Sequence, residues 1–164
     1  LSGQTQFPHA HISLHRDGHV VDPFDPDGAI SCGAPSDTTL WAPEINTPPG
    51  GLLSIGFADY VPSFTEVKAG TAATPTLTQN APIVLWAFAF GALPDDVLHV
   101  SINGPDGPLF SADDVLDRQQ ALFMRAGGLN PPDHDWATGD YVGTVIHQRD
   151  GVELDRQTVS ITLP

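Results

Sequence analysis

Two histidines near the start of the sequence, His9 and His11, have a spacing that could serve one metal ion. If they lie on a β-strand, their side chains point to the same face, with Cα atoms roughly 6.5 Å apart. Imidazole is a common zinc ligand, and a catalytic zinc takes three protein ligands and leaves one position for water. The spacing fits part of a metal site, but histidines that bind no metal are common on exposed strands, so the pair alone does not distinguish the two.

The residues that follow predict the strand that would position this pair. Residues 12–24 form two short runs with strand chemistry, separated by Asp17-Gly18. Asp-Gly between such runs is a strong hairpin signal, because both central residues of a type I′ turn need a positive φ. We therefore expect His9, His11, Ser13 and His15 on one strand face, with His15 exposed to solvent.

Residues 1–24 also resemble the end of the catalytic domain of lysostaphin-type (LytM-like) zinc metalloendopeptidases, which are bacterial cell-wall hydrolases. In that family a Ser-Gly turn leads into Pro-His-x-His on a strand, followed by a charged pair, a Gly turn and a closing Val-Asp-Pro. The matching residues here are Ser2-Gly3, Pro8 to His11, Arg16-Asp17, Gly18 and Val21-Asp22-Pro23. The resemblance implies that His11 is a zinc ligand and that His9 is the catalytic histidine, which orients water and stabilises the tetrahedral intermediate.

The family takes its other zinc ligands from a His-x-x-x-Asp motif upstream of His-x-His. No histidine of this sequence has Asp four residues later. We therefore expect the zinc site to be incomplete in this chain, and the partner that completes it to be an upstream part of the same protein. The first residue is Leu1 rather than Met, and no leader peptide is visible, which fits a C-terminal portion. The implied substrate is a peptidoglycan cross-peptide, and the implied location is extracellular or periplasmic.

The remaining sequence predicts an all-β fold. Residues 22–62 are rich in Pro, Gly, Asp and Ser, so we place a domain boundary there: 1–62 as the peptidase-type hairpin segment with its extension, and 63–164 as an Ig-like β-sandwich. The motif Gly139-Asp140-Tyr141 resembles the tyrosine corner of such domains, with Gly143 where antibody domains have a cysteine. Ser111 and Asp114 leave a helical turn open as an alternative to a strand. The predicted strands are FTEVKAG, TPTLTQ, PIVLWAFAFG, DVLHVSING, ALFMRAG, DYVGTVIHQ and VELDRQTVSITL.

Charge and hydropathy exclude several partners. Six Lys and Arg against twenty Asp and Glu give a net charge of −14. Such a chain repels phosphate backbones and anionic headgroups, so nucleic acids and membrane surfaces are poor partners, and neutral or cationic ligands suit it better. No apolar run approaches the roughly 20 residues of a membrane-spanning helix.

Several other residues have a functional and a structural interpretation. Cys32, the only cysteine, is expected to pair with the upstream part of the protein, or else to be a buried thiol. Asp22, Asp25 and Asp27 are better explained as a polar turn than as a calcium loop, and Asp133-His134-Asp135 as a solvated loop than as a cation site. The alternating apolar residues of one strand face, which are Val84, Trp86, Phe88 and Phe90, fit a sandwich core better than a sugar-binding surface.

Three functions follow from these observations. The first is a cell-wall zinc endopeptidase completed by upstream residues. The second is a non-catalytic binding or scaffold module with a degenerate peptidase end. The third is zinc or copper storage by ligands of this chain alone, such as His9, His11 and His15.

Overall fold

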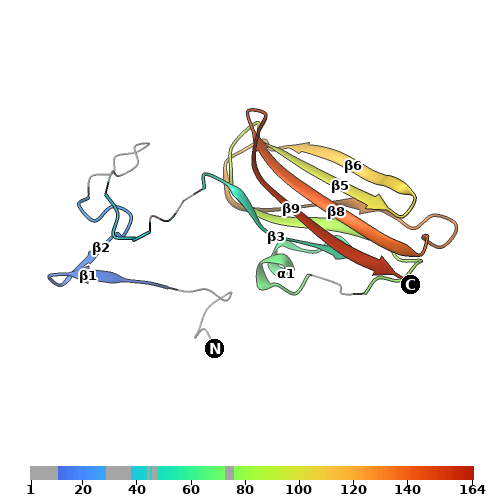
Figure 1. Cartoon of the computed structure of the whole chain (residues 1–164), viewed down its shortest axis with the longest axis horizontal. Helices are drawn as coiled ribbons and strands as arrows, with labels where there is room; N and C mark the ends of the chain where they lie inside the picture. The colour runs from blue at the N-terminus through green and yellow to red at the C-terminus, as the bar shows by residue number, and fades with distance from the viewer. Residues whose placement is uncertain (1–10, 29–37, 44, 46–47, 73–75) are drawn as a thin grey trace. The chain divides into compact units, whose positions relative to one another are not determined.

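The structure is a computed structural model that describes residues 11–28, 38–43, 45, 48–72 and 76–164. The chain divides into two compact units, Leu1–Thr47 and Pro48–Pro164 (Figure 1). The described strands are all antiparallel, which confirms the all-β prediction.

The first unit contains the predicted hairpin. Strand β1 (Leu14–Arg16) pairs with β2 (His19–Val21), and Asp17 and Gly18 between them have φ of 51° and 83°. Both turn residues therefore have the left-handed conformation that a type I′ turn needs.

The position of the histidines relative to this hairpin differs from the expectation. Because β1 begins at Leu14, His11 precedes the strand, and His9 lies outside the described residues. The ladder ends at the Leu14–Val21 pair, because Asp22 begins a turn and Pro23 has no N–H with which to continue pairing.

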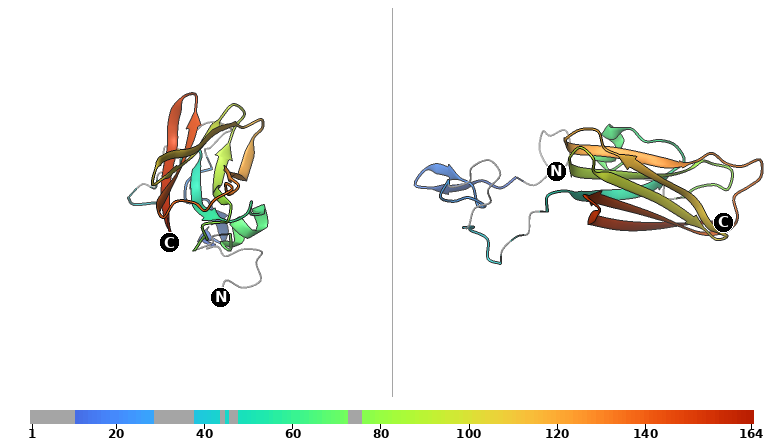
Figure 2. Two further views of the ribbon diagram at one scale, coloured as in Figure 1. Left: turned by 90° about the vertical axis from the view of Figure 1, so that its right-hand side faces the viewer. Right: turned by 90° about the horizontal axis from the view of Figure 1, so that it is seen from above.

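The second unit is a sandwich of two antiparallel sheets (Figures 1 and 2). One sheet has the order β3-β4-β7 and the other β6-β5-β8-β9. This seven-stranded arrangement has the architecture of an Ig-like sandwich. The strands are β3 (Gly51–Ala58), β4 (Ile83–Ala92), β5 (Val97–Gly104), β6 (Gly107–Val115), β7 (Gln120–Leu129), β8 (Gly139–Arg149) and β9 (Val152–Leu163).

The two compact units of the structure meet at residues 47/48, whereas the sequence analysis placed the boundary at 62/63. The reason is β3, which lies in the Pro- and Gly-rich segment and pairs with β4 from Gly51–Phe90 to Ala58–Val84. Leu52 and Phe57 of β3 are buried in the main core. A segment assigned to the extension is thus an integral strand of the sandwich.

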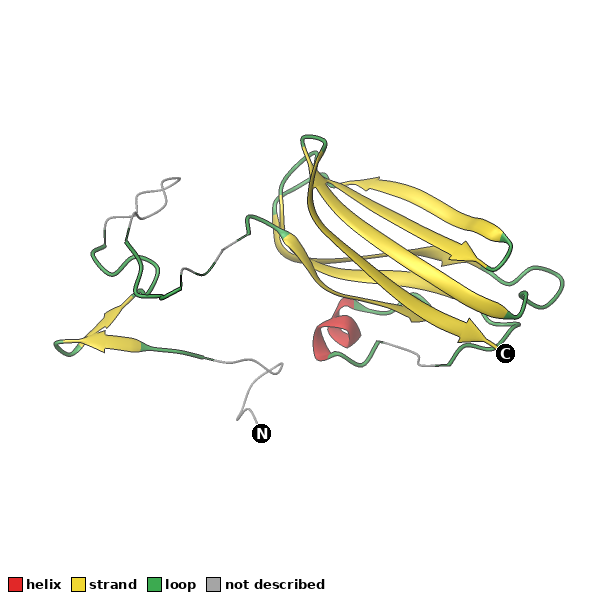
Figure 3. Cartoon of the chain, viewed as in Figure 1, coloured by secondary structure: helices red, strands yellow, loops and turns green. Residues whose placement is uncertain are grey.

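Two other predicted elements also differ. FTEVKAG is not a strand but helix α1 (Phe64–Ala69), in red in Figure 3, because Ser63 and Glu66 form a complete capping box and Gly70 ends the helix with φ of 74°. Residues 111–115 are not helical but belong to β6, which pairs with β5. Of TPTLTQ, residues 76–79 are described and are not in a strand.

Strand β4 is buried on both faces. Leu85, Ala87 and Ala89 belong to the core between the sheets, whereas Trp86 and Phe88 pack on the other face with Val67 of α1. The prediction that Trp86 and Phe88 are core residues is confirmed, although their cover is α1 rather than the second sheet. A continuous apolar sequence is expected where both faces of a strand are covered.

The tyrosine corner is confirmed. The hydroxyl of Tyr141, near the start of β8, donates a hydrogen bond of 2.9 Å to the Ala137 carbonyl, and the side chain is buried. At Gly143 a Cβ atom would lie 2.7 Å from Leu85 and 2.9 Å from Phe57. The position taken by a cysteine in antibody domains is therefore filled here by side chains of the opposite sheet.

No helix among the residues that the structure describes is long and apolar enough to cross a membrane.

The fold predicts that residues 48–164 unfold cooperatively on their own and that residues 63–164 do not form the same stable domain. Removing β3 deletes Leu52 and Phe57 from the core and leaves one edge of β4 without its partner. Since truncating one such side chain costs about 2–5 kcal/mol, the loss should exceed ~3 kcal/mol. Urea unfolding followed by tryptophan fluorescence compares the two fragments; equal midpoints would show that β3 is dispensable.

Candidate functional site

The histidines of the first unit do not converge where the structure describes them. His11 is exposed, and its Nε2 lies 3.1 Å from the Ser13 hydroxyl. His15 and His19 are exposed as well, and they lie on opposite faces of the hairpin, because His15 is opposite Val20 and His19 is opposite Arg16. Within residues 11–28, 38–43, 45, 48–72 and 76–164, no three His, Cys, Asp or Glu side chains are grouped to hold a metal ion.

The aspartates that follow the hairpin form a polar turn. Asp22 accepts a hydrogen bond of 2.8 Å from the Phe24 N–H, and Asp27 accepts one of 3.2 Å from the Thr38 hydroxyl. Arg16 lies 4.0 Å from Asp27. These carboxylates organise the local chain, as the turn interpretation predicts. Cys32 lies outside the described residues.

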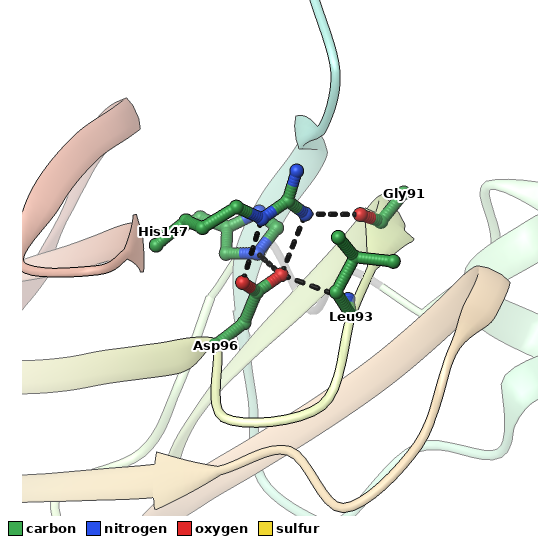
Figure 4. Close-up of polar contacts among 5 residues, drawn as sticks. Gly91, Leu93, Asp96 and His147 are labelled. Carbon is green, nitrogen blue, oxygen red and sulfur yellow. Dashed lines mark hydrogen bonds and ion pairs between the residues drawn. The ribbon is translucent and has the colours of Figure 1, made fainter. Parts of the chain in front are cut away.

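A buried cluster of three charged or polar side chains lies at one end of the sandwich, where β4 turns into β5 (Figure 4). Asp96 is 1% exposed and His147 is 0% exposed. Asp96 accepts hydrogen bonds of 2.8 Å from Nε and from one terminal nitrogen of Arg149, and one of 2.9 Å from the Leu93 N–H. The same nitrogen of Arg149 donates to the Gly91 carbonyl at 2.7 Å.

The electrostatics of this cluster stabilise the ionised carboxylate. The hydrogen bonds from Arg149 lower the pKa of Asp96 to about 2, against the opposing effect of burial. Nε2 of His147 lies 3.1 Å from Asp96, whereas Nδ1 is buried and has no hydrogen-bond partner. The ring packs edge-on to Phe123, with centroids 5.8 Å apart.

This cluster ties the β4–β5 turn to the end of β8, and it also supports the entry of the chain into the sandwich. A Cβ atom on Gly50 would lie 3.2 Å from the His147 ring, and one on Gly91 would lie 2.5 Å from the Pro49 carbonyl. Gly50 of the Pro-Pro-Gly-Gly segment therefore leaves room for the backbone to pass directly over the His147 ring. The arrangement is structural, since it contains no exposed nucleophile or open coordination position.

Sequence analysis did not single out this cluster. His147 and Arg149 are two residues apart on one strand, which places them on the same face, and that spacing was the available signal. Their partner Asp96 is separated by about fifty residues, so only the pairing of β5 with β8 brings it near.

A pocket of about 610 Å³ lies where the β5–β6 turn meets the β7–β8 loop. The polar side chains in its lining are those of Asp106, His134 and Asp135, all exposed. The other lining residues are Gly104, Pro105, Gly107, Pro108, Leu109, Pro132, Trp136, Ala137 and Tyr141. Asp133-His134-Asp135, expected as a solvated loop, therefore contributes two side chains to a concave surface.

The loop that lines this pocket is held by several hydrogen bonds. The Trp136 indole donates to the Ala81 carbonyl at 2.8 Å, and the Trp136 N–H donates to the Gln79 carbonyl at 2.8 Å. The Gln79 side chain donates to Thr138 at 3.0 Å. The pocket is therefore formed before any ligand binds.

Comparisons with known proteins do not assign a family. No family model matches the sequence, and no curated protein matches it. One similar solved structure is a Bacteroides fragilis protein assigned as a β-galactosidase, with 13% identity and a TM-score of 0.43 over 69% of this chain and 17% of that chain. Another is the Pseudomonas fluorescens alkylpurine DNA glycosylase AlkC bound to DNA containing an abasic site analogue, with 12% identity and a TM-score of 0.37 over 71% of this chain and 30% of that chain.

A third similar structure is the CARDB domain of a Pyrococcus furiosus protein in complex with di-metal ions, with 14% identity and a TM-score of 0.37 over 74% of this chain and 99% of that chain. The present chain thus spans less than a third of the length of the first two proteins. At these TM-scores the similarities carry no argument about function.

The Asp96 cluster predicts a dependence of stability on pH. Because the pKa of Asp96 is about 2 in the folded state and 3.8 as its ordinary value, its contribution is present above pH 3.8 and is lost as the pH falls through 2. The difference corresponds to about 2 kcal/mol. In urea unfolding, the free energy of unfolding should therefore decline between pH 6 and pH 2, and Asp96→Asn should remove this decline. At pH 6 the variant should be less stable than the unsubstituted protein by about 2–4 kcal/mol, because Arg149 loses its partner.

Asp117→Asn is the control, since Asp117 is exposed and has the same charge. It should retain the acid-dependent decline and the stability at pH 6. If the two variants behave alike, the decline comes from the overall charge rather than from the buried cluster.

Proposed function

We propose that this chain is the C-terminal portion of a bacterial zinc metalloendopeptidase that cleaves peptide cross-links of the cell wall. The observation that carries the proposal is Pro8-His9-Ala10-His11 followed directly by a hairpin with a type I′ turn at Asp17-Gly18, which closes at Asp22-Pro23. In this proposal His11 is a zinc ligand and His9 is the catalytic histidine. The site is outside the cell, in the extracellular space or the periplasm.

The donor chemistry of the described segment is compatible with zinc. The His11 imidazole is exposed, and its hydrogen-bond partner among the described residues is the exposed Ser13 hydroxyl, so no buried bond to these residues has to be broken for it to bind a metal. Imidazole nitrogen is a preferred zinc ligand. Zinc, when bound, would supply hydroxide near neutral pH and polarise the scissile carbonyl. His9 would accept or donate a proton and hydrogen-bond the developing oxyanion.

The exposed apolar residues at the hairpin support the proposal that additional strands pack against it. Ile12 and Val20 are 70% and 73% exposed. An isolated two-stranded hairpin is marginally stable in water, and a sheet of three or more strands with a covered apolar face is the stable form. The proposal therefore requires additional strands, as well as the two additional zinc ligands, from residues outside this sequence.

A non-catalytic scaffold is the second candidate. The observation that favours it is that none of the seven histidines starts a His-x-x-x-Asp motif. A single zinc-binding imidazole with a neighbouring histidine leaves the ion mostly hydrated, since catalytic sites use three protein ligands. The two candidates make opposite predictions for the complete protein.

The endopeptidase proposal predicts that the 164-residue chain binds zinc weakly, whereas the complete protein binds one zinc ion tightly and hydrolyses a peptidoglycan cross-peptide. In the complete protein, His11→Ala should abolish both zinc binding and activity. His9→Ala should lose activity by about 10²–10³-fold and keep most of the metal, because a residue that acts on the transition state need not bind the ion. Calorimetric zinc titration and a cross-peptide cleavage assay measure the two effects.

His19→Ala is the matched control, because His19 is an exposed histidine of the same hairpin outside the His-x-His pair. It should leave zinc binding and cleavage unchanged. Tight stoichiometric zinc in the 164-residue chain would locate the other ligands within it, and a complete protein without zinc binding would leave the scaffold as the function.

A further inference from the structure

The pocket at the β5–β6 end of the sandwich has an unusual charge environment. None of the chain's six Lys and Arg residues is among the residues that line it, whereas Asp106, Asp135 and the imidazole of His134 are. For the described residues, the structure records no ion pair of either carboxylate. The two carboxylates therefore face no Lys or Arg at this pocket, on a chain whose net charge is already −14.

Apart from His134 and the Tyr141 hydroxyl, the rest of the lining is mainly apolar and includes three rigid proline rings. The rings of Pro105, Pro108 and Pro132 contribute to the wall, together with the partly buried Leu109. Proline has a fixed φ and little side-chain freedom, so ordering this surface around a ligand costs little entropy. The volume of about 610 Å³ lies in the range of small-molecule and side-chain sites, about 300–1,000 Å³.

The two loops that form the pocket are packed directly on each other. A Cβ atom on Gly104 would lie 3.0 Å from the Tyr141 ring, and one on Gly139 would lie 3.1 Å from Pro105. The charge of Asp106 also acts on the base of the pocket: burial first, and then this carboxylate, raise the pKa of the Tyr141 hydroxyl. The tyrosine corner thus sets the distance between the two loops as well as the start of β8.

We propose that this pocket binds the ammonium group at the end of an aliphatic chain, with a lysine-type side chain of a peptide as its ligand. Asp106 and Asp135 supply the charge complementarity, and the proline wall with Leu109 takes up the alkyl stem. A lysine side chain has this composition, a compact ammonium on four methylene groups that packs along apolar surface while its charge stays at a polar rim. The proposal is independent of the zinc site, because all of its residues lie in the unit Pro48–Pro164.

Two other ligand classes fit the pocket less well. A calcium ion takes six to eight oxygen ligands, and no group of three His, Cys, Asp or Glu side chains capable of holding a metal occurs in the described part of the chain, where Asp106, His134 and Asp135 all lie. An anionic ligand would be repelled by the two carboxylates, and the lining offers it His134 but no Arg or Lys. A primary amine fits better, because its positive charge is attracted by the carboxylates and it does not need a shell of six to eight oxygen ligands.

The Trp136 indole N–H, which belongs to a lining residue, provides a reporter for the test. The 164-residue chain, labelled with ¹⁵N, is titrated with acetyl-Gly-Lys-Gly-amide, and the three indole resonances are followed by NMR. We expect a saturable shift of the Trp136 indole at millimolar peptide, with Trp41 and Trp86, which do not line the pocket, unchanged. The same peptide acetylated at the lysine ammonium should produce no shift, and 0.5 M salt should weaken binding several-fold.

Asp106→Asn and Asp135→Asn should each weaken binding about three- to tenfold, as expected for an exposed charge-assisted contact. Asp117→Asn removes the same charge after β6, outside the pocket lining, and should leave binding unchanged. Titration with 1,5-diaminopentane distinguishes the sources of the ammonium group: a comparable shift identifies free diamines as ligands as well, and a smaller shift assigns the site to peptide lysine. Equal shifts from the acetylated peptide, an equal loss in Asp117→Asn, or no shift of Trp136 at saturating peptide would overturn the proposal.

Discussion

The burial of β4 on both faces is the constraint on which the rest of the sandwich depends. A strand with an almost continuous apolar sequence must be covered on each side, or a large apolar area stays in water. One face of β4 meets the second sheet through residues such as Leu85, and the other meets α1 through Trp86. The helix is only Phe64–Ala69, yet its capping box and its Gly70 end fix it at the place where that cover is needed. β3 and β7 then satisfy the two hydrogen-bonding edges of β4.

The free edge of β3 also needs hydrogen-bond partners for its backbone where it lies beside the other sheet. Asp155 on β9 accepts from the Leu52 N–H at 2.9 Å, and Gln157 donates to the Leu52 carbonyl at 2.8 Å. Two side chains of β9 therefore replace a neighbouring strand at the irregular point of the β3 ladder. The Asp96 cluster serves the same purpose nearby, because it satisfies the Leu93 N–H and the Gly91 carbonyl with charged groups.

These features separate structural from functional chemistry. The deeply buried polar side chains, Asp96 and His147, lie within hydrogen-bond distance of each other, and Asp96 also accepts from Arg149 and the backbone, so they support the fold. The groups available for ligands are exposed: His11 in the first unit, and Asp106 and Asp135 around the pocket in the second. The proposed zinc site and the proposed ammonium site therefore use different units of the chain, and each can be tested without the other.

The sequence alone determined the features that depend on neighbouring residues. Asp17-Gly18 specified a type I′ turn because both residues tolerate positive φ, and short apolar or alternating runs between turn residues located β4, β5, β7, β8 and β9. The tyrosine corner was also visible, since its bond joins residues four apart. Ser63 and Glu66 are also a local helix-start signal, but the prediction did not use it and assigned FTEVKAG to a strand.

Only the tertiary structure decided what depends on distant partners. β3 has a glycine-rich, proline-preceded sequence that resembles a linker, and it becomes a strand because β4 offers an apolar edge. Asp96 meets His147, and the β5–β6 turn meets the β7–β8 loop, through strand pairing over roughly thirty to fifty residues. Such contacts are fixed by sheet register and by the close packing of two layers, neither of which is encoded in a single segment.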